Sequence, residues 1–369
     1  MPPIQFSTIF ANRRKELKLT QEDVAQFVGV SRAAVSKWEQ GLSYPDITLL
    51  PKLAMLLDLT IDSLLGYQPQ LTVMRIAELY SELAQRFAKE EFAQVDEAIQ
   101  QLIKEYYSCY PFLSKMAQLY LNYLLQSPDP PATADTILQL CSRVRQHSGD
   151  MYLINEVTAI EAATHLLLKQ PQQVVEQLGS QPRIEFNHEL LIASALAMMG
   201  DAAQAKRVLQ VSAYQHLLSL FGALTELMAL EKDRLSYVDV TVDRLEKLAG
   251  IFGVRELSIH TVLVFYLKAA NVYAMQQNEE QAARMVERYL QTCKTLKFPL
   301  QFSGDDYFYL LQEWIDEEQT VMQQAPRDMD TIKRDLLAAV DANPLLAPLL
   351  QRKELAILYE NVKHVLKEV

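Results

Sequence analysis

The stretch TQEDVAQFVGVSRAAVSKWEQG, residues 20–41, predicts two short helices joined by a tight turn. Thr20 has a hydroxyl that can accept a hydrogen bond from a free backbone N–H at a helix start, and Asp23 stands three residues later, where a capping box places an acid. Gly29 can adopt the positive φ angle that ends the first helix, and Ser31 is a suitable cap for the second. Gly41 is expected to close the second helix.

The side chains of these two helices divide into an inner and an outer face. The first helix is expected to bury an apolar stripe of Val24, Ala25, Phe27 and Val28, and the second to bury Val35 and Trp38. The outer face of the second helix carries small, polar and basic residues, namely Arg32, Ala33, Ser36, Lys37 and Gln40. Such a face suits the DNA major groove, because Arg and Lys donate to guanine O6 and N7 and to phosphates.

The segment from about Phe6 to Gly66 resembles the DNA-binding domain of the Cro/XRE family of helix-turn-helix regulators. The motifs that carry the resemblance are RRK (13–15), TQEDVA (20–25), VS (30–31), VSKWEQG (35–41), YPD (44–46) and LLPKLAMLLDLTIDSLLG (49–66). The resemblance implies a lambda-repressor-like domain of five helices. Pro51 falls inside the apparent fourth helix, and because proline is tolerated in a first turn, we expect that helix to begin near Thr48. The alternative is an ordinary helical hairpin without DNA binding.

The resemblance also implies which residues contact DNA. Arg32 and Lys37 would read the major groove, while Gln21 and Ser43 would contact phosphates. The full set of expected DNA-binding residues is Arg13, Arg14, Lys18, Gln21, Ser31, Arg32, Ala33, Ser36, Lys37 and Ser43. Together with Lys15, the basic members form the local positive face that docking requires.

Charge and length divide the chain into a reader and a larger remainder. Residues 1–66 hold seven Lys or Arg and seven Asp or Glu, whereas the other residues hold 28 basic and 39 acidic side chains, which gives the net charge of −11. The acidic remainder should be repelled by the duplex. In a chain of 369 residues we therefore expect a DNA-binding domain at 1–66, a linker at 67–70 and a helical regulatory and dimerisation domain at 71–369.

The region after the linker is expected to be helical and repetitive. Helix pairs with turns at 170–171, 200–201 and 277–278 each carry a small residue twelve positions before its partner, as in Ala163–Val175, Ala193–Ala205 and Ala270–Ala282. A degenerate pair is expected at about 215–252, where Val238, Val240 and Val242 alternate as in a strand but also fit a longer helical face. The pattern resembles degenerate tetratricopeptide repeats, and we predict an all-α solenoid. Generic helical pairs without a superhelix are the alternative.

Several classes of function are disfavoured by the sequence. The six histidines lack partners at metal-ligand spacing, and the three cysteines, far apart, are expected to be buried free thiols. No glycine-rich phosphate loop occurs, so we expect no catalytic residue, no metal and no cofactor. The N-terminal residues do not resemble a signal peptide, and the most apolar run, Leu190 to Met199, has about half the length that a bilayer requires. We therefore expect a cytoplasmic protein with no membrane partner.

Two functions remain. A reader domain followed by tetratricopeptide-like helices resembles the peptide-sensing regulators of Gram-positive bacteria, which implies transcription regulation, a homodimer on an inverted-repeat operator in double-stranded DNA, and a short peptide or small ligand. Amide and aromatic side chains on candidate first helices of repeats are the expected ligand contacts, namely Asn122, Asn155, Tyr266, Asn271 and Tyr273. The apolar run from Leu345 to Leu366 is expected to form the dimer interface, and an ordinary capping helix is the alternative. The alternative function is a protein-interaction scaffold tethered to DNA.

Overall fold

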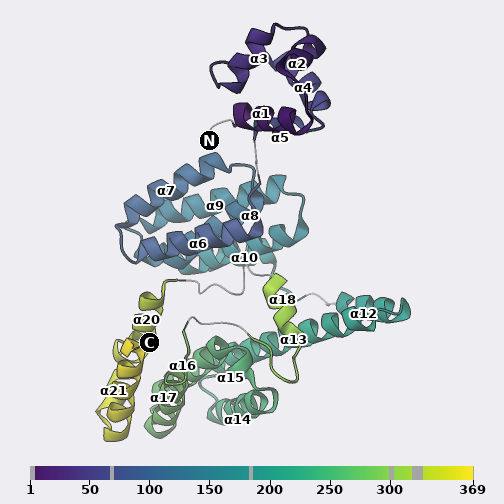
Figure 1. The fold of residues 1–369 in the computed structure, drawn as a ribbon. Coiled ribbons are helices and arrows are strands. Elements are labelled where there is room, and N and C mark those ends of the chain that lie inside the picture. The colour runs from purple at the N-terminus through teal and green to yellow at the C-terminus, as the bar shows by residue number, and fades with distance from the viewer. Residues whose placement is uncertain (1–4, 67–69, 183–185, 299–302, 318–326, 369) are drawn as a thin grey trace.

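The computed structural model describes residues 5–66, 70–182, 186–298, 303–317 and 327–368. Within these ranges the regular structure is entirely helical and contains no strand (Figure 1), which confirms the all-α prediction. None of the helices in this part of the chain is both long and apolar enough to cross a bilayer. The expected linker at 67–70 lies outside the described residues except for Gln70.

The N-terminal part folds as five α-helices around a small apolar core. The helices are α1 (Phe6–Glu16), α2 (Gln21–Val28), α3 (Arg32–Glu39), α4 (Leu50–Leu56) and α5 (Ile61–Leu65), with a 3₁₀ turn at Ile47–Leu49. Fully buried side chains from all five helices form the core, including Phe6, Phe10, Val24, Val35, Leu53 and Leu64. Pro51 stands in the first turn of α4, where its missing N–H leaves no intrahelical bond unmade.

One sequence-based assignment in this domain is wrong. Phe27 was expected in the buried stripe of α2, but its side chain is 48% exposed. The helix is only eight residues long, and its buried residues are Val24, Ala25 and Val28. These three lie on one side at the spacing of a helical turn, and Phe27 falls outside that arc.

The next part of the chain packs around α8 (Tyr110–Tyr123). Its neighbours are α6 (Val73–Phe87), α7 (Phe92–Glu105), α9 (Pro130–His147) and α10 (Met151–Leu167). Most of α8 is buried, including Lys115, whose ammonium pairs with Glu156 of α10 and donates to Gln118 at 3.2 Å. Ser114 donates to the other carboxylate oxygen of Glu156 at 2.6 Å. The Lys115 ammonium and the Glu156 carboxylate therefore both have polar partners inside this apolar core.

The three predicted helix pairs are all present. They are α10 with α11 (Pro171–Leu178), α12 (His188–Met198) with α13 (Ala202–Leu230), and α16 (Ile259–Met275) with α17 (Glu279–Cys293). The α13 helix continues past the predicted repeat and pairs with α14 (Leu235–Phe252) as well. The valines at 238, 240 and 242 therefore lie on a helix, as predicted, and not on a strand. The short α15 (Val254–Leu257) leads into α16.

The C-terminal elements are α18 (Leu311–Glu317), α20 (Met329–Asp341), a 3₁₀ turn at Ala347–Gln351 and α21 (Lys353–Glu368). They pack on α13 and on the last of these pairs, with α18 against α13 and α21 against α17. Apolar side chains of this region enter the core that α13, α16 and α17 share, namely Leu346, Leu355, Val362 and Leu366. The apolar run that suggested a dimer interface is thus largely buried within the chain itself.

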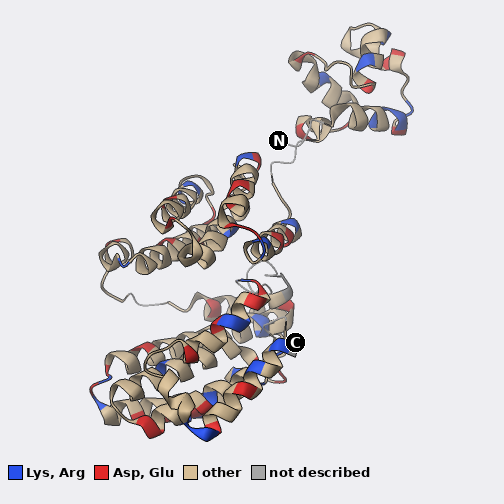
Figure 2. Cartoon of the chain, turned by 90° about the vertical axis from the view of Figure 1, so that its left-hand side faces the viewer, with Lys and Arg blue, Asp and Glu red and all other residues tan. Residues whose placement is uncertain are grey.

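The described residues hold three separate apolar cores. The first lies within residues 6–64, the second within 76–160 and the third within 214–366. Figure 2 shows acidic and basic residues interspersed along the helices of the C-terminal half, outside these cores. Between the second and third cores, α11 buries no residue and α12 buries only Ala193. Among the described residues, the stacking of helix pairs is therefore interrupted at α11 and α12.

The buried pair in α8 allows a direct test of its contribution to stability. Lys115→Met should lower the free energy of unfolding by about 3 kcal/mol, because it leaves the Glu156 carboxylate without a counter-charge in a mostly buried site. Lys247→Met is the matched control, since Lys247 pairs with Asp243 at 2.7 Å while both side chains are more than half exposed. Its effect should stay below about 1 kcal/mol. Equal effects in urea denaturation would contradict this account.

Candidate nucleic-acid interface

The outer face of α3 depends on the capping of α2 and α3. The Thr20 hydroxyl accepts from the Asp23 N–H at 3.1 Å, while the Asp23 carboxylate accepts from the Thr20 N–H at 2.7 Å. Gly29 ends α2 with φ 79°, and the Ser31 hydroxyl accepts from the Ala34 N–H at 3.2 Å to start α3. The predicted caps and turn are all confirmed, and they set the direction in which α3 leaves α2.

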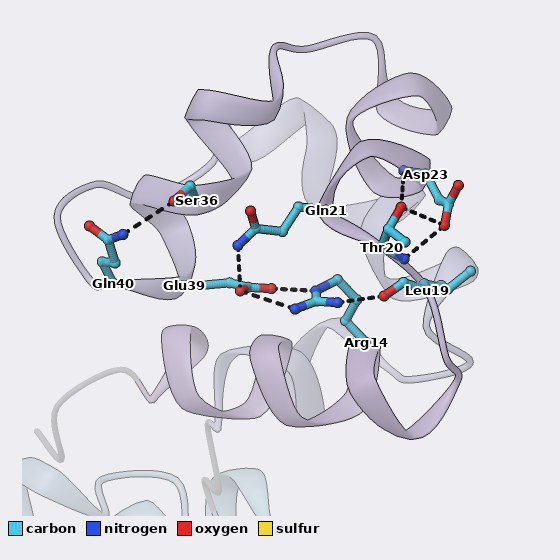
Figure 3. A network of polar contacts seen from close by, with 8 residues as sticks. All are labelled: Arg14, Leu19, Thr20, Gln21, Asp23, Ser36, Glu39 and Gln40. Carbon is cyan, nitrogen blue, oxygen red and sulfur yellow. Dashed lines mark hydrogen bonds and ion pairs between the residues drawn. The ribbon is translucent and has the colours of Figure 1, made fainter.

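The exposed side of α3 carries the predicted basic residues. Arg32, Ala33 and Lys37 are exposed, whereas Val35 and Trp38 are buried on the opposite side. Ser36 is half-buried and accepts a hydrogen bond from Gln40 at 3.2 Å (Figure 3). Within the described residues, neither Arg32 nor Lys37 forms an ion pair with an acidic side chain. Two unneutralised positive charges therefore project from one helix face.

A buried polar network holds α3 against α1 and α2. Arg14 of α1 donates through Nε and Nη2 to the two carboxylate oxygens of Glu39, at 2.5 and 3.2 Å. Gln21 of α2 donates to the same carboxylate at 2.8 Å, and Arg14 also donates to the Leu19 carbonyl (Figure 3). The Arg14 and Glu39 side chains are only 12% and 11% exposed. One carboxylate at the end of α3 thus fixes that helix to the two preceding ones.

The environment of Glu39 favours its ionised form. Burial alone would raise the pKa of Glu39, but the hydrogen bonds from Arg14 and Gln21 and the charges of Arg14 and Lys15 outweigh burial, so the pKa lies below its usual value of 4.5. The negative charge is consequently neutralised locally. It does not oppose phosphates approaching the exposed side of α3.

The other predicted DNA-binding residues differ in their exposure and in the hydrogen bonds that they already form. Arg13 donates to the Leu57 carbonyl at the end of α4 at 2.9 Å and to Glu16 at 3.0 Å. Lys18 is exposed in the turn after α1, with a positive φ of 57°. Ser43 is half-buried in the segment after α3. The geometry of Arg14 and Gln21 fits positioning of α3, whereas Lys18, Arg32 and Lys37 are open to solvent.

Sequence reasoning overlooked Glu39. Glu39 is part of the VSKWEQG motif, and the signal that could have found its role is that an acid on a helix facing phosphates needs a neutralising partner. Arg14 lies 25 positions away in the chain, so its pairing with Glu39 depends on how α1 crosses α3. That crossing cannot be derived from local sequence patterns.

The expected ligand-binding residues do not share one site. Asn122 donates to the Tyr80 hydroxyl at 2.7 Å and lines a hollow of about 370 Å³ between α8 and α10. Asn155 is exposed on α10. Asn271 donates to the Leu267 carbonyl at 2.8 Å and accepts from Asn343 at 2.9 Å.

The two tyrosines of the predicted set lie on α16. Tyr273 is buried and donates to Asp239 at 2.7 Å, and Tyr266 is half-buried beside Phe265. Their surroundings belong to the third apolar core, whereas Asn122 belongs to the part of the chain that contains the second. In this group, only Asn122 lines a described hollow.

Comparison with known proteins identifies the N-terminal domain. Residues 10–64 match a protein family described as helix-turn-helix. A stretch of 70 residues is 36% identical to the HTH-type transcriptional activator BcrR of Enterococcus faecalis. This stretch makes up 19% of this chain and 34% of BcrR. The chain thus matches about a third of the length of this relative. It carries a helix-turn-helix domain of the Cro/XRE type at its N-terminus, followed by a helical region.

Among solved structures, the apo form of the competence regulator ComR from Streptococcus vestibularis is similar to most of this chain. The similarity covers 86% of this chain and 98% of that chain, with 12% sequence identity and a TM-score of 0.29. A TM-score this low does not establish a shared arrangement of the helices. BcrR is a transcriptional activator, which agrees with the expectation that this chain is a regulator without catalytic residues.

The network around Glu39 gives a prediction about stability. Glu39→Gln should lower the free energy of unfolding of the N-terminal domain by about 3 kcal/mol, because the buried Arg14 guanidinium loses its counter-charge. The fluorescence of Trp38 reports on this domain, and a Trp314→Phe background removes the other of the two tryptophans. Glu16→Gln is the control, since Glu16 pairs with Arg13 at 3.0 Å but is 63% exposed.

The comparison of the wild type with Glu39→Gln should also depend on pH. Because the pKa of Glu39 is lowered by folding, its contribution to stability is complete above the usual value of 4.5 and is lost as pH falls through the lowered value. The difference in stability between the wild type and Glu39→Gln should therefore shrink on acidification below about pH 4.5. A difference that stays constant across this range would show that the charge of Glu39 is not what stabilises α3.

Proposed function

We propose that this protein is a sequence-specific DNA-binding regulator of transcription, in which α3 enters the major groove. The observation that carries this proposal is the exposed face with Arg32, Ala33 and Lys37 on a helix whose orientation is fixed by a buried carboxylate. The match of residues 10–64 to the helix-turn-helix family supports it. In such domains the second helix of the motif reads base edges while its neighbours contact the backbone.

We also propose that residues 1–66 form the DNA-binding unit and residues 71–369 a regulatory unit joined by the short linker at 67–70. The separate apolar core within residues 6–64 supports an independent first unit. The net charge of −11 resides in the second unit, which is therefore repelled from DNA. DNA contact is then confined to the exposed basic residues of the first unit.

The proposed regulatory unit senses a short peptide or another small ligand. Support comes from the hollow of about 370 Å³ that Asn122 lines together with Arg327 and leucines of α8 and α10. Apolar walls with the amides of Asn122 and Gln126 and the guanidinium of Arg327 suit a ligand that combines an apolar side chain with a backbone carbonyl or a carboxylate. Of the five predicted ligand-binding residues, Asn122 is the one whose surroundings favour this role.

Substitution of Arg32 tests the proposed DNA docking. Arg32→Ala should weaken operator binding by about 1–3 kcal/mol and reduce discrimination at one base position, because a bidentate contact to guanine is lost. Lys18→Ala should instead weaken binding to all sequences alike and flatten the dependence on salt. Lys247→Ala, at an exposed lysine of α14, is the control. Unchanged affinity and preference of Arg32→Ala in a titration against the mapped operator would contradict this docking.

Substitution of Asn122 tests ligand sensing. In a melting-temperature screen with cell-derived peptides and small molecules, a true ligand should stabilise the wild type and lose most of its effect on Asn122→Ala. Asn271→Ala is the matched control, because Asn271 bonds to Leu267 and Asn343 and does not line the hollow. A ligand that stabilises Asn122→Ala as strongly as the wild type binds elsewhere. A ligand that leaves operator affinity unchanged does not regulate, since control requires different affinities for two states.

A further inference from the structure

The helix α12 is apolar on all sides and yet mostly exposed. Its large side chains and the methionine that follows reach solvent, with exposed fractions of 52% for Leu190, 66% for Leu191, 50% for Ile192, 89% for Met198 and 79% for Met199. Ala193 is the only residue of the helix that is buried. A helix without a polar face is normally enclosed by other elements, because no side of it is suited to water.

The other described elements of the chain do not cover α12. The helix packs on α13, and Figure 1 shows α12 at the end of α13 that lies away from α14, α16 and α17. The preceding helix α11 buries no residue and also exposes Val175 and Leu178, at 52% and 51%. The gap between the second and third apolar cores therefore coincides with an uncovered apolar surface.

The charge of this surface indicates what can cover it. From Leu190 to Gly200 the chain contains no Asp, Glu, Lys or Arg, whereas its net charge is −11. Two copies of such an acidic chain repel each other over most of their surfaces, but no like charges meet where two α12 helices touch. A partner recognised by charge would find nothing to pair with here. A second copy of the same apolar helix is suited to it.

We propose that two copies of this protein associate through α12, packed antiparallel about a two-fold axis, so that two α12–α13 hairpins form a four-helix bundle. In that arrangement the same patch serves both partners, as a two-fold interface requires. The two Glu189 carboxylates lie at opposite ends, and the helix dipoles oppose each other. Ser194, Ala195 and Ala197 allow the helix axes to approach closely.

The two-fold arrangement would also serve DNA recognition, and this part of the inference rests on the proposed function. One helix-turn-helix domain contacts a single half-site, whereas a two-fold dimer presents two of them to an inverted repeat. The interface proposed here differs from the one expected from the sequence. The C-terminal apolar residues of that earlier expectation, such as Leu355 and Val362, are buried against the chain's own core.

Measurement of the mass in solution without DNA tests the association separately from DNA binding. At about 10 μM, where a dimer with a Kd of about 1 μM or less is mostly associated, sedimentation equilibrium should give twice the chain mass for the wild type. The double variant Leu191→Glu/Met198→Glu should sediment as a monomer, because paired carboxylates would be buried in the interface. Ile251→Glu is the matched control: Ile251 is 75% exposed at the end of α14, and this variant should remain dimeric.

Cross-linking tests the antiparallel geometry and does not depend on a destabilising substitution. Ala195 lies midway between Leu191 and Met198, so in an antiparallel pair the two Ala195 positions approach the axis. Ala195→Cys should therefore form a covalent dimer on mild oxidation, while Ile251→Cys should not. The three native cysteines are buried and will not interfere.

The outcomes separate clearly. A monomeric wild type, or a double variant that remains dimeric, would overturn the inference, and the former would leave α12 to an apolar segment of another protein. Cross-linking of Ala195→Cys no greater than that of Ile251→Cys would overturn the antiparallel packing. A dimer that behaves as expected but binds no DNA would contradict the proposed function alone.

Discussion

A helical hairpin has an apolar face that it cannot bury by itself, and the larger part of this structure follows from that constraint. Around α8 the constraint is met by four neighbouring helices, and in the C-terminal half it is met when α20 and α21 close over the pair α16–α17. Side chains as large as Tyr120 and Phe265 are consequently removed from solvent. Among the described residues, the hairpin α12–α13 lacks such a neighbour on its outer side, which is why its exposed leucines and methionines require an explanation beyond the single chain.

In the DNA-binding domain the decisive interaction is of a different kind. A core of eleven buried apolar residues holds the five helices together, but apolar contacts tolerate small rotations of one helix against another. The hydrogen bonds that Arg14 and Gln21 donate to Glu39 have defined directions, so they fix the rotation of α3 about its own axis. The positions of Arg32 and Lys37 relative to a DNA groove depend on that rotation. A buried charge pair is a weak source of net stability, and orientation is the better reason for its presence here.

The sequence alone predicted those features that local chemistry determines. The caps at Thr20 and Ser31, the turn at Gly29 and the three helix pairs follow from residue types at fixed spacings, and all were confirmed. Long-range contacts could not be predicted in this way. The partners Arg14 and Glu39 are 25 residues apart, and Asn271 and Asn343 are 72 apart, so a single sequence gives no information on which amide or carboxylate each will meet. Asn271 resembled a ligand-binding residue for this reason, whereas in the structure its amide joins α16 to the turn after α20, through Asn343.

The proposed ligand hollow beside Asn122 and the proposed dimer contact through α12 are connected by α10 and α11. The hollow beside Asn122 involves Leu166 and Leu167 at the end of α10, and α10 is followed by α11 and then by the exposed helix α12. No residue of α11 is buried, so this helix is weakly held compared with the helices of the two neighbouring cores. A ligand in the hollow would contact α10, the helix that leads into α11. If α12 forms the two-fold contact, a change at the end of α10 alters the direction in which each half of a dimer leaves the interface, and with it the spacing of the two DNA-binding domains. Regulation then requires only that the ligand bind one of two spacings more tightly than the other.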